Sequence, residues 1–230
     1  MTKETLLLTI AVLGGTGREG KGLAYRWARA GYRVLIGSRS SEKAVKVASE
    51  IMELLEGSSS VVGATNLEAA EQADIVVLTV PYAAHRETLE SVKGALKGKI
   101  LVDVTAPLVP PKVRKVQMPP AGSAAQEAKE IVGEEVEVVA AFQSVPHEHL
   151  LGEQDVECDV LVTGSSKKAR DEVLTLVEAT GLKGWDAGPI ENSVVVEGLA
   201  SVLININKRY GSKHAGIRIT GVSEQSTDSA

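Results

Sequence analysis

Aromatic residues, cysteine and an excess of charge of one sign are all scarce in this chain of 230 residues. Only 3% of the residues are aromatic, and Cys158 is the single cysteine, which excludes internal disulfides and cysteine-based zinc clusters. The net charge of −5 lacks the basic excess of a general nucleic-acid-binding protein. The longest apolar run, residues 6–13, falls far short of the ~20 residues that a membrane-spanning helix needs. We therefore expect a soluble, cytoplasmic globular protein.

Alanine, valine, leucine and glycine supply most of the apolar residues, and they favour close packing of helices on a sheet. Apolar runs typical of strands buried on both faces alternate with helical patterns through the first half of the chain. The strands are predicted, with helices between them, at residues 6–13, 32–36, 61–64, 74–80 and 99–104. This alternation predicts an α/β fold of the Rossmann type, a doubly wound parallel sheet with helices on both faces.

The second half of the chain resumes the alternation after a proline-rich break at residues 107–120. The elements expected there are a helix, a strand, a strand–helix–strand unit and a long amphipathic last helix, at residues 122–132, 136–141, 159–187 and 193–210. We interpret residues 1–150 as a nucleotide-binding domain and 151–222 as a small C-terminal α/β domain. The polar residues 223–230 are predicted to form a disordered tail.

A glycine pattern, Gly15-x-Gly17-x-x-Gly20, follows the first predicted strand and opens the first helix. Gly15 allows a tight turn, Gly17 lets the backbone approach a pyrophosphate, and Gly20 lets helix and strand pack closely. The helix N-terminus then presents free N–H groups and a partial positive charge to the phosphates. The pattern predicts a dinucleotide-binding turn, although a strand–turn–helix joint without a ligand would carry the same glycines.

The segment after the second predicted strand indicates which dinucleotide is bound. NAD-binding proteins carry an Asp or Glu here, which accepts hydrogen bonds from the ribose hydroxyls. This chain has Ser38, Arg39 and Lys43 instead, and their hydroxyl, guanidinium and ammonium groups suit a 2′-phosphate. These residues favour NADP(H) over NAD(H). An ordinary polar loop with solvated charges is the alternative.

No recognisable acid–base set or metal cluster accompanies these features. His147 and His149 have no carboxylate or cysteine cluster around them in the sequence, so we expect no metal. Cys158 lies between two acidic residues, which raise the pKa of a thiol, so we expect it to be inert. Pro81 follows the fourth predicted strand, where it either borders a nicotinamide or only begins a turn. A nicotinamide enzyme without an acid or base can pass hydride directly to a second ring, and positioning then supplies the catalysis.

Five segments of the chain carry a more specific pattern. They are Gly14-Gly15-Thr16-Gly17, Ile36-Gly37-Ser38-Arg39 with Lys43, Gly122-Ser123-Ala124-Ala125, Asp186-Ala187-Gly188-Pro189 and Gly216-Ile217-Arg218-Ile219-Thr220-Gly221. Together they resemble the NADPH-dependent coenzyme F420 reductases, or F420:NADP oxidoreductases, and the resemblance extends from residue 9 to residue 222. The serine–arginine loop, the DAGP segment and the Asn205-x-Asn207 helix are more specific than the glycine turn.

This resemblance implies reversible hydride transfer between NADP(H) and coenzyme F420, an 8-hydroxy-5-deazaflavin, without an acid–base residue. It also implies a small C-terminal domain that forms one wall of the deazaflavin cleft, and a homodimer. In the dinucleotide, the pyrophosphate would contact Thr16, Gly17, Arg18 and Glu19, and the 2′-phosphate would contact Ser38, Arg39 and Lys43. The nicotinamide would border Pro81, Val145 and His147, and the deazaflavin would meet Gln143, Ser144 and Val145. Some archaeal relatives carry histidine where Gln143 stands, and glutamine cannot change its charge.

Three questions stay open from the residues alone. Asn205 and Asn207 either meet the anionic tail of the deazaflavin or belong to a solvent-facing helix end. The acceptor of the hydride could instead be FMN, FAD or a ferric chelate. The chain could also be a non-catalytic NADP(H)-binding module, which the extent of the resemblance in its second half disfavours.

Replacing Arg39 with a neutral residue is expected to weaken the binding of NADPH far more than the binding of NADH. A charged hydrogen bond to the 2′-phosphate is worth about 1.5–3 kcal/mol, and NADH has no such phosphate. The measurement is the dissociation constant of each dinucleotide for the original and the altered protein. Equal losses for the two dinucleotides would show that Arg39 does not contact the 2′-phosphate.

Overall fold

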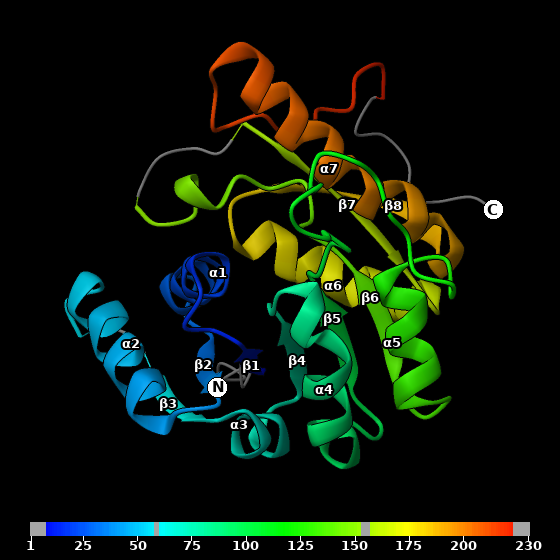
Figure 1. The fold of residues 1–230 in the computed structure, drawn as a ribbon. Coiled ribbons are helices and arrows are strands. Elements are labelled where there is room, and N and C mark those ends of the chain that lie inside the picture. The colour runs from blue at the N-terminus through cyan, green and yellow to red at the C-terminus, as the bar shows by residue number, and fades with distance from the viewer. Residues whose placement is uncertain (1–7, 58–59, 153–156, 223–230) are drawn as a thin grey trace.

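The computed structural model describes residues 8–57, 60–152 and 157–222. Its centre is one eight-stranded sheet with the order β3-β2-β1-β4-β5-β6-β7-β8 (Figure 1). The strands are β1 (Thr9–Leu13), β2 (Arg33–Ser38), β3 (Val61–Thr65), β4 (Ile75–Leu78), β5 (Ile100–Asp103), β6 (Glu137–Ala140), β7 (Asp159–Gly164) and β8 (Lys183–Pro189). The first six have the strand order of dinucleotide-binding Rossmann folds, which confirms the predicted fold class. The predicted tail lies outside the described residues.

Seven α-helices and three short 3-10 helices connect the described strands. They are α1 (Arg18–Arg29), α2 (Ser41–Leu54), α3 (Asn66–Gln72), α4 (Tyr82–Val92), α5 (Ala124–Val132), α6 (Lys167–Ala179), α7 (Ser193–Tyr210), η1 (Lys93–Ala95), η2 (His147–His149) and η3 (Ile190–Asn192). The bounds of α5 and α7 lie within a few residues of those predicted, and α1 to α4 lie between the predicted strands as expected. A capping box begins α3, with the Glu68 amide donating to Thr65 Oγ1 and the Thr65 amide donating to the Glu68 carboxylate.

Two apolar cores cover the two faces of the sheet. The alternating residues of β1 point into them in turn, with Ile10 packed in the core that contains α1, α2 and α6, and Ala11 in the core that contains α3, α4 and α5. Both side chains are completely buried, as the continuous apolar run predicts for a central strand. None of the helices in the described ranges is both long and apolar enough to cross a membrane.

The strand direction reverses once, between β6 and β7, which pair antiparallel, whereas every other pair in the sheet is parallel. A parallel connection would need a crossover helix back to the opposite edge of the sheet. Here the chain leaves β6 at the carboxyl edge of the first six strands, stays at that edge through η2, and enters β7 from there. The strands after residue 150 therefore continue the same sheet, and the division into domains 1–150 and 151–222 stays a prediction.

Candidate functional site

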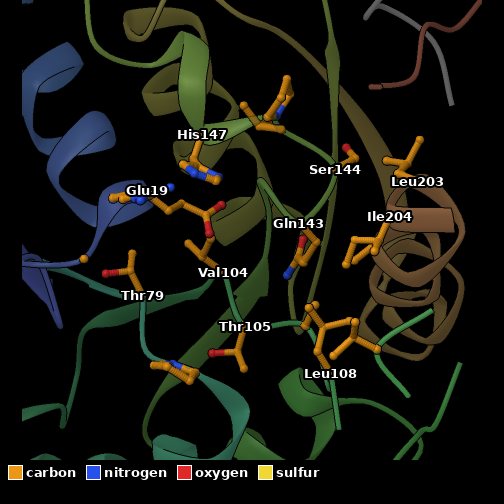
Figure 2. Close-up of a pocket in the computed structure, with 18 of the residues that line it drawn as sticks. Glu19, Thr79, Val104, Thr105, Leu108, Gln143, Ser144, His147, Leu203 and Ile204 are labelled. Atoms are coloured by element: carbon orange, nitrogen blue, oxygen red, sulfur yellow. The ribbon is translucent and has the colours of Figure 1, made fainter. Parts of the chain in front are cut away.

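A cleft of about 820 Å³ opens at the carboxyl edge of the first six strands (Figure 2). The glycine turn and the first turn of α1 form one side, and the residues after β4 and β5 form the floor. Residues 143–148 and the inner face of α7 form the opposite wall. The cleft adjoins the point where the strand order changes direction between β1 and β4, which is where ligands bind in open α/β sheets.

Backbone contacts fix the glycine turn closely against the sheet. The Gly15 amide nitrogen donates to the carbonyl oxygens of both Val12 and Gly37, each at 3.1 Å, so the turn is tied to the end of β2. A side chain at Gly20 would meet Thr79 Oγ1 and would lie 2.8 Å from the Gly15 Cα atom, which agrees with the close packing expected there. Gly17 is the N-cap of α1 and no side chain caps this helix end. Its first N–H groups are therefore open to an anion.

The three residues expected at a 2′-phosphate come together at the end of β2 and the start of α2. Ser38 is buried, and its Oγ accepts a hydrogen bond of 3.2 Å from the Ser40 amide. The side chains of Arg39 and Lys43 are exposed, and neither has an ion-pair partner among the described residues. The hydrogen bond between Gly15 and Gly37 places this group beside the glycine turn, although outside the lining of the 820 Å³ cleft.

The residues expected at the rings line the cleft itself, namely Pro81, Gln143, Ser144, Val145 and His147. Gln143 Nε2 donates a hydrogen bond of 2.8 Å to the main-chain oxygen of Asp103. This contact leaves Gln143 Oε1 buried without a partner in the described structure, and His147 Nε2 is in the same state. Buried polar atoms normally have hydrogen-bond partners, so these two atoms fit a cleft that a polar ring system completes.

The two asparagines of α7 differ in position. Asn207 lines the cleft, and its Oδ1 accepts a hydrogen bond of 3.0 Å from the Ala215 amide, which holds the chain after α7 against the helix end. Asn205 is exposed and does not line the cleft. The structure therefore does not bring the pair together at one surface. Thr16, in the glycine turn, is also outside the cleft lining.

Glu19 is the carboxylic acid on the dinucleotide side of the cleft. Its side chain, in the first turn of α1, points into the cleft toward His147 and the ends of β4 and β5 (Figure 2). The residue is partly exposed at the cleft, yet burial of the carboxyl group by the surrounding walls raises its pKa to about 8. Near neutral pH the carboxyl group therefore carries a proton in a large share of molecules.

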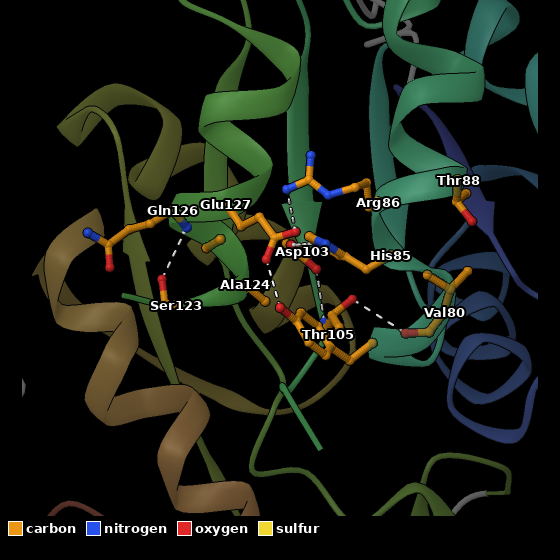
Figure 3. Close-up of polar contacts among 12 residues, drawn as sticks. Val80, His85, Arg86, Thr88, Asp103, Thr105, Ser123, Ala124, Gln126 and Glu127 are labelled. Atoms are coloured by element: carbon orange, nitrogen blue, oxygen red, sulfur yellow. Dashed lines mark hydrogen bonds and ion pairs between the residues drawn. The ribbon is translucent and has the colours of Figure 1, made fainter. Parts of the chain in front are cut away.

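A buried polar cluster lies beneath the cleft (Figure 3). His85 Nε2 and Asp103 Oδ2 are 2.7 Å apart, and both side chains are completely buried. Burial lowers the pKa of this histidine, but the charge of Asp103, its hydrogen bond and the charge of Glu127 together raise the pKa overall. Asp103 Oδ1 also accepts a hydrogen bond from the Thr105 amide at 3.0 Å. Asp103 ends β5 and Thr105 lines the cleft, so the pair anchors the cleft floor.

Glu197 of α7 belongs to the same buried region. Its carboxylate accepts hydrogen bonds from the Ala124 amide at 2.6 Å and the Ala125 amide at 3.0 Å, at the N-terminus of α5. Burial, followed by the nearby Asp103 charge, raises the pKa of Glu197 to about 8 even though these amides favour the ionised form. This contact joins α7, the outer wall of the cleft, to the Rossmann part of the sheet.

Sequence reasoning missed several residues of this site. Val104, Thr105, Leu203 and Ile204 line the cleft, and the residues after β5 could have been found from the rule that ligands bind beyond the carboxyl ends of strands. Glu197 stands alone as a charge inside the apolar stripe of α7, which is the one signal it leaves in the sequence. Within the described ranges, no group of three His, Cys, Asp or Glu side chains is placed to hold a metal ion.

The fold and the glycine turn define a Rossmann-type dinucleotide-binding protein. A family model described as "NADP oxidoreductase coenzyme F420-dependent" matches residues 9–107. The F420-dependent NADP reductase of Methanothermobacter marburgensis is 42% identical over 224 residues, which cover 94% of this chain and 100% of that protein. The enzyme of the same name from Methanocaldococcus jannaschii is 37% identical over 223 residues, covering 94% and 99% of the two chains.

A solved structure agrees with these sequence relatives. The protein is from Arthrobacter sp. FB24, and its own assignment as an F420-dependent NADP reductase is provisional. It has a TM-score of 0.79 and 26% identity, and the match covers 93% of this chain and 100% of that one. The chain belongs to the family of coenzyme F420-dependent NADP oxidoreductases.

The buried Glu197 predicts a pH-dependent stability. Its pKa is about 8 in the folded chain and near 4.5 when exposed, so between these values the folded state holds a proton that the unfolded state has lost. The free energy of unfolding should therefore fall as the pH rises from 5 to 8. Glu197→Gln should reduce this slope by about 1 kcal/mol per pH unit, measured by urea denaturation at several pH values.

Glu191→Gln, at an exposed position close to Glu197 in the chain, is the matched control and should leave the slope unchanged. The same slope in the Glu197→Gln variant and the original protein would show that this carboxyl group is ionised in both the folded and the unfolded states.

Proposed function

We propose that this protein transfers a hydride reversibly between NADP(H) and coenzyme F420. The observation that carries the proposal is the 820 Å³ cleft that runs from a phosphate-binding glycine turn to α7 and contains unpartnered buried polar atoms. A cleft of this size has room for a second ring beside a nicotinamide. The sequences of the relatives match nearly the whole chain, and the names of these relatives support NADP and F420 as the two redox partners.

The dinucleotide would lie across the glycine turn. Thr16, Gly17, Arg18 and the main chain of Glu19 are proposed at the pyrophosphate, where the N-terminus of α1 offers N–H groups and a partial positive charge. At the 2′-phosphate we propose Ser38, Arg39 and Lys43. The exposed cations of this group support the assignment, because neither has an ion pair to break among the described residues before it meets a phosphate.

The rings would meet inside the cleft. Pro81, Val145 and His147 are proposed to border the nicotinamide, with Gln143, Ser144 and Val145 at the deazaflavin. The free Oε1 atom of Gln143 can accept a hydrogen bond from a ring N–H, because Asp103 O holds the other end of the amide. Asn207 is proposed at the tail of the deazaflavin, for which its Nδ2 group is available; Asn205, which is exposed, is the weaker of the two tail proposals.

Positioning is the catalytic contribution that we propose for the protein. When bound, NADPH supplies the hydride from nicotinamide C4, and C5 of the deazaflavin substrate accepts it. The cleft walls contributed by Val104, Val145 and Leu203 are apolar and exclude water around the rings. No side chain is required to form a covalent bond with either ring, so holding the two carbons in contact accounts for the rate.

The function is tested by mixing the purified protein with NADPH and oxidised coenzyme F420 and following the absorbance of both. We expect turnover with F420 and much slower or no turnover with FMN, FAD and a ferric chelate in parallel assays. Preference for a flavin or the ferric chelate would support the alternative reductase. Tight binding of NADPH without oxidation by any acceptor would instead identify a non-catalytic binding module.

We also propose that the enzyme is a homodimer that acts in the cytoplasm, where NADP(H) is held. The dimer proposal is supported by an exposed apolar stripe on α7, which Val195, Val202 and Ile206 form on one face of the helix. The exposed fractions of these residues are 65%, 44% and 38%. Such a continuous apolar face on a surface helix favours contact with a second protein surface.

Val202→Glu should convert the dimer to a monomer, because it places a charge in the centre of this stripe. Light scattering after size-exclusion chromatography measures the mass directly. Val45→Glu, on the exposed side of α2 at 52% exposure, is the matched control and should remain dimeric. A monomeric original protein, or two dimeric variants, would contradict the assignment of this stripe to the dimer.

A further inference from the structure

Glu19 is placed unusually for an acid in the first turn of a helix. A carboxylate at this position normally stabilises the helix by facing its own N-terminal N–H groups. Among the described residues no side chain caps α1, and the Glu19 carboxyl group turns into the cleft instead (Figure 2). It points toward the space between Thr79, Val104 and His147. His147, together with Pro81 and Val145 of the same cleft, is proposed above to border the nicotinamide.

The charged and titratable groups that share the cleft with Glu19 come from all of its sides. They are Arg18 on the same helix, Tyr82 at the start of α4, His147 and Glu148 in η2, and Lys213 after α7. None of them forms a hydrogen bond or ion pair with Glu19 within the part of the chain that the structure describes. Burial, with no compensating partner, is what raises the pKa of Glu19 to about 8.

A nicotinamide ring changes its charge in the reaction, and Glu19 is the acid positioned to respond. The ring is neutral in NADPH and positively charged in NADP⁺. A nearby positive charge favours the ionised form of a carboxyl group, whereas a neutral ring in an enclosed cleft favours the protonated form. Resting on the proposed function, we propose that Glu19 discriminates between the two redox forms of the dinucleotide, as a neutral acid beside NADPH and as a carboxylate beside NADP⁺.

This assignment keeps the net charge of the nicotinamide and Glu19 together constant through the reaction. As the hydride leaves NADPH for C5 of the deazaflavin, the nicotinamide gains one positive charge. Glu19 loses one proton to the solvent in the same conversion and gains one negative charge. The hydride, with its two electrons, reduces the deazaflavin to an anion, which takes up one proton from the solvent. The Glu19 carboxylate offsets the positive charge left on the nicotinamide. Glu19 needs no contact with the deazaflavin for this role.

The test is the ratio of the affinities for NADP⁺ and NADPH, measured by calorimetric titration at pH 6.5 and pH 9. The phosphates are the same in both ligands, so their own titration and any repulsion from Glu19 cancel in the ratio. We expect the ratio to shift about tenfold in favour of NADP⁺ at pH 9, because an opposite charge lowers a carboxyl pKa by at least about one unit. In Glu19→Gln the ratio should not change with pH.

Glu148→Gln is the matched control, because Glu148 lines the same cleft from the opposite wall and is exposed. This variant should keep the pH-dependent ratio of the original protein. A constant ratio in the original protein, or the same shift in Glu19→Gln, would overturn the inference. Tight NADPH binding at pH 6.5 together with a constant ratio would reject only the role proposed for Glu19 and would leave the proposed function standing. Failure to bind either dinucleotide at either pH would reject the proposed function as well.

Discussion

The hydrogen bond from the Gly15 amide to the Gly37 carbonyl is the contact on which the dinucleotide side of this site depends. It holds the turn after β1 against the end of β2, and so brings two phosphate-binding segments that are separate in the sequence to one place. A side chain at Gly15 would lie 2.7 Å from the Val12 carbonyl oxygen, so only glycine allows the turn to come this close. The N-terminus of α1 and the cations of the β2–α2 loop then face the same side of the sheet.

The reversal of strand direction after β6 has the corresponding role on the ring side. Because β7 enters from the carboxyl edge, residues 141–152 run along that edge instead of crossing the sheet. This path carries Gln143, Ser144 and His147 into the cleft. The later helix α7 closes the cleft from outside, and the contact from Glu197 to the N-terminus of α5 holds it there. Residues 143–148 and α7, which lie far apart in the sequence, thus form the same wall of the cleft.

Charge is distributed unevenly over the site, in a way that fits its proposed ligands. Exposed, unpaired cations lie where phosphates are expected, and apolar side chains surround the place expected for the rings. Glu19 lines the cleft and Glu197 lies in the buried region beneath it, and burial of the carboxyl group raises the pKa of each to about 8. A cleft of this kind can hold a nicotinamide in either charge state without a fixed opposing charge. Direct hydride transfer requires a cleft that accepts both the neutral and the positively charged nicotinamide, and it does not require a dedicated acid.

The sequence by itself determined the elements, the phosphate turn and the preference for NADP(H). Apolar periodicity, glycine spacing and the absence of an acid after β2 are local properties. Periodicity predicted the first six strands, α5 and α7 to within a few residues, and the other two features predicted the phosphate turn and NADP(H). Only the tertiary structure decided that β7 pairs antiparallel with β6 and that Asn207 but not Asn205 lines the cleft. It also decided that the Glu197 carboxylate accepts a hydrogen bond from the N-terminus of α5. Burial and pKa follow from neighbours that are distant in the chain, such as Asp103 and Ala124 around Glu197. The one-dimensional pattern contains the residue types but not those distances.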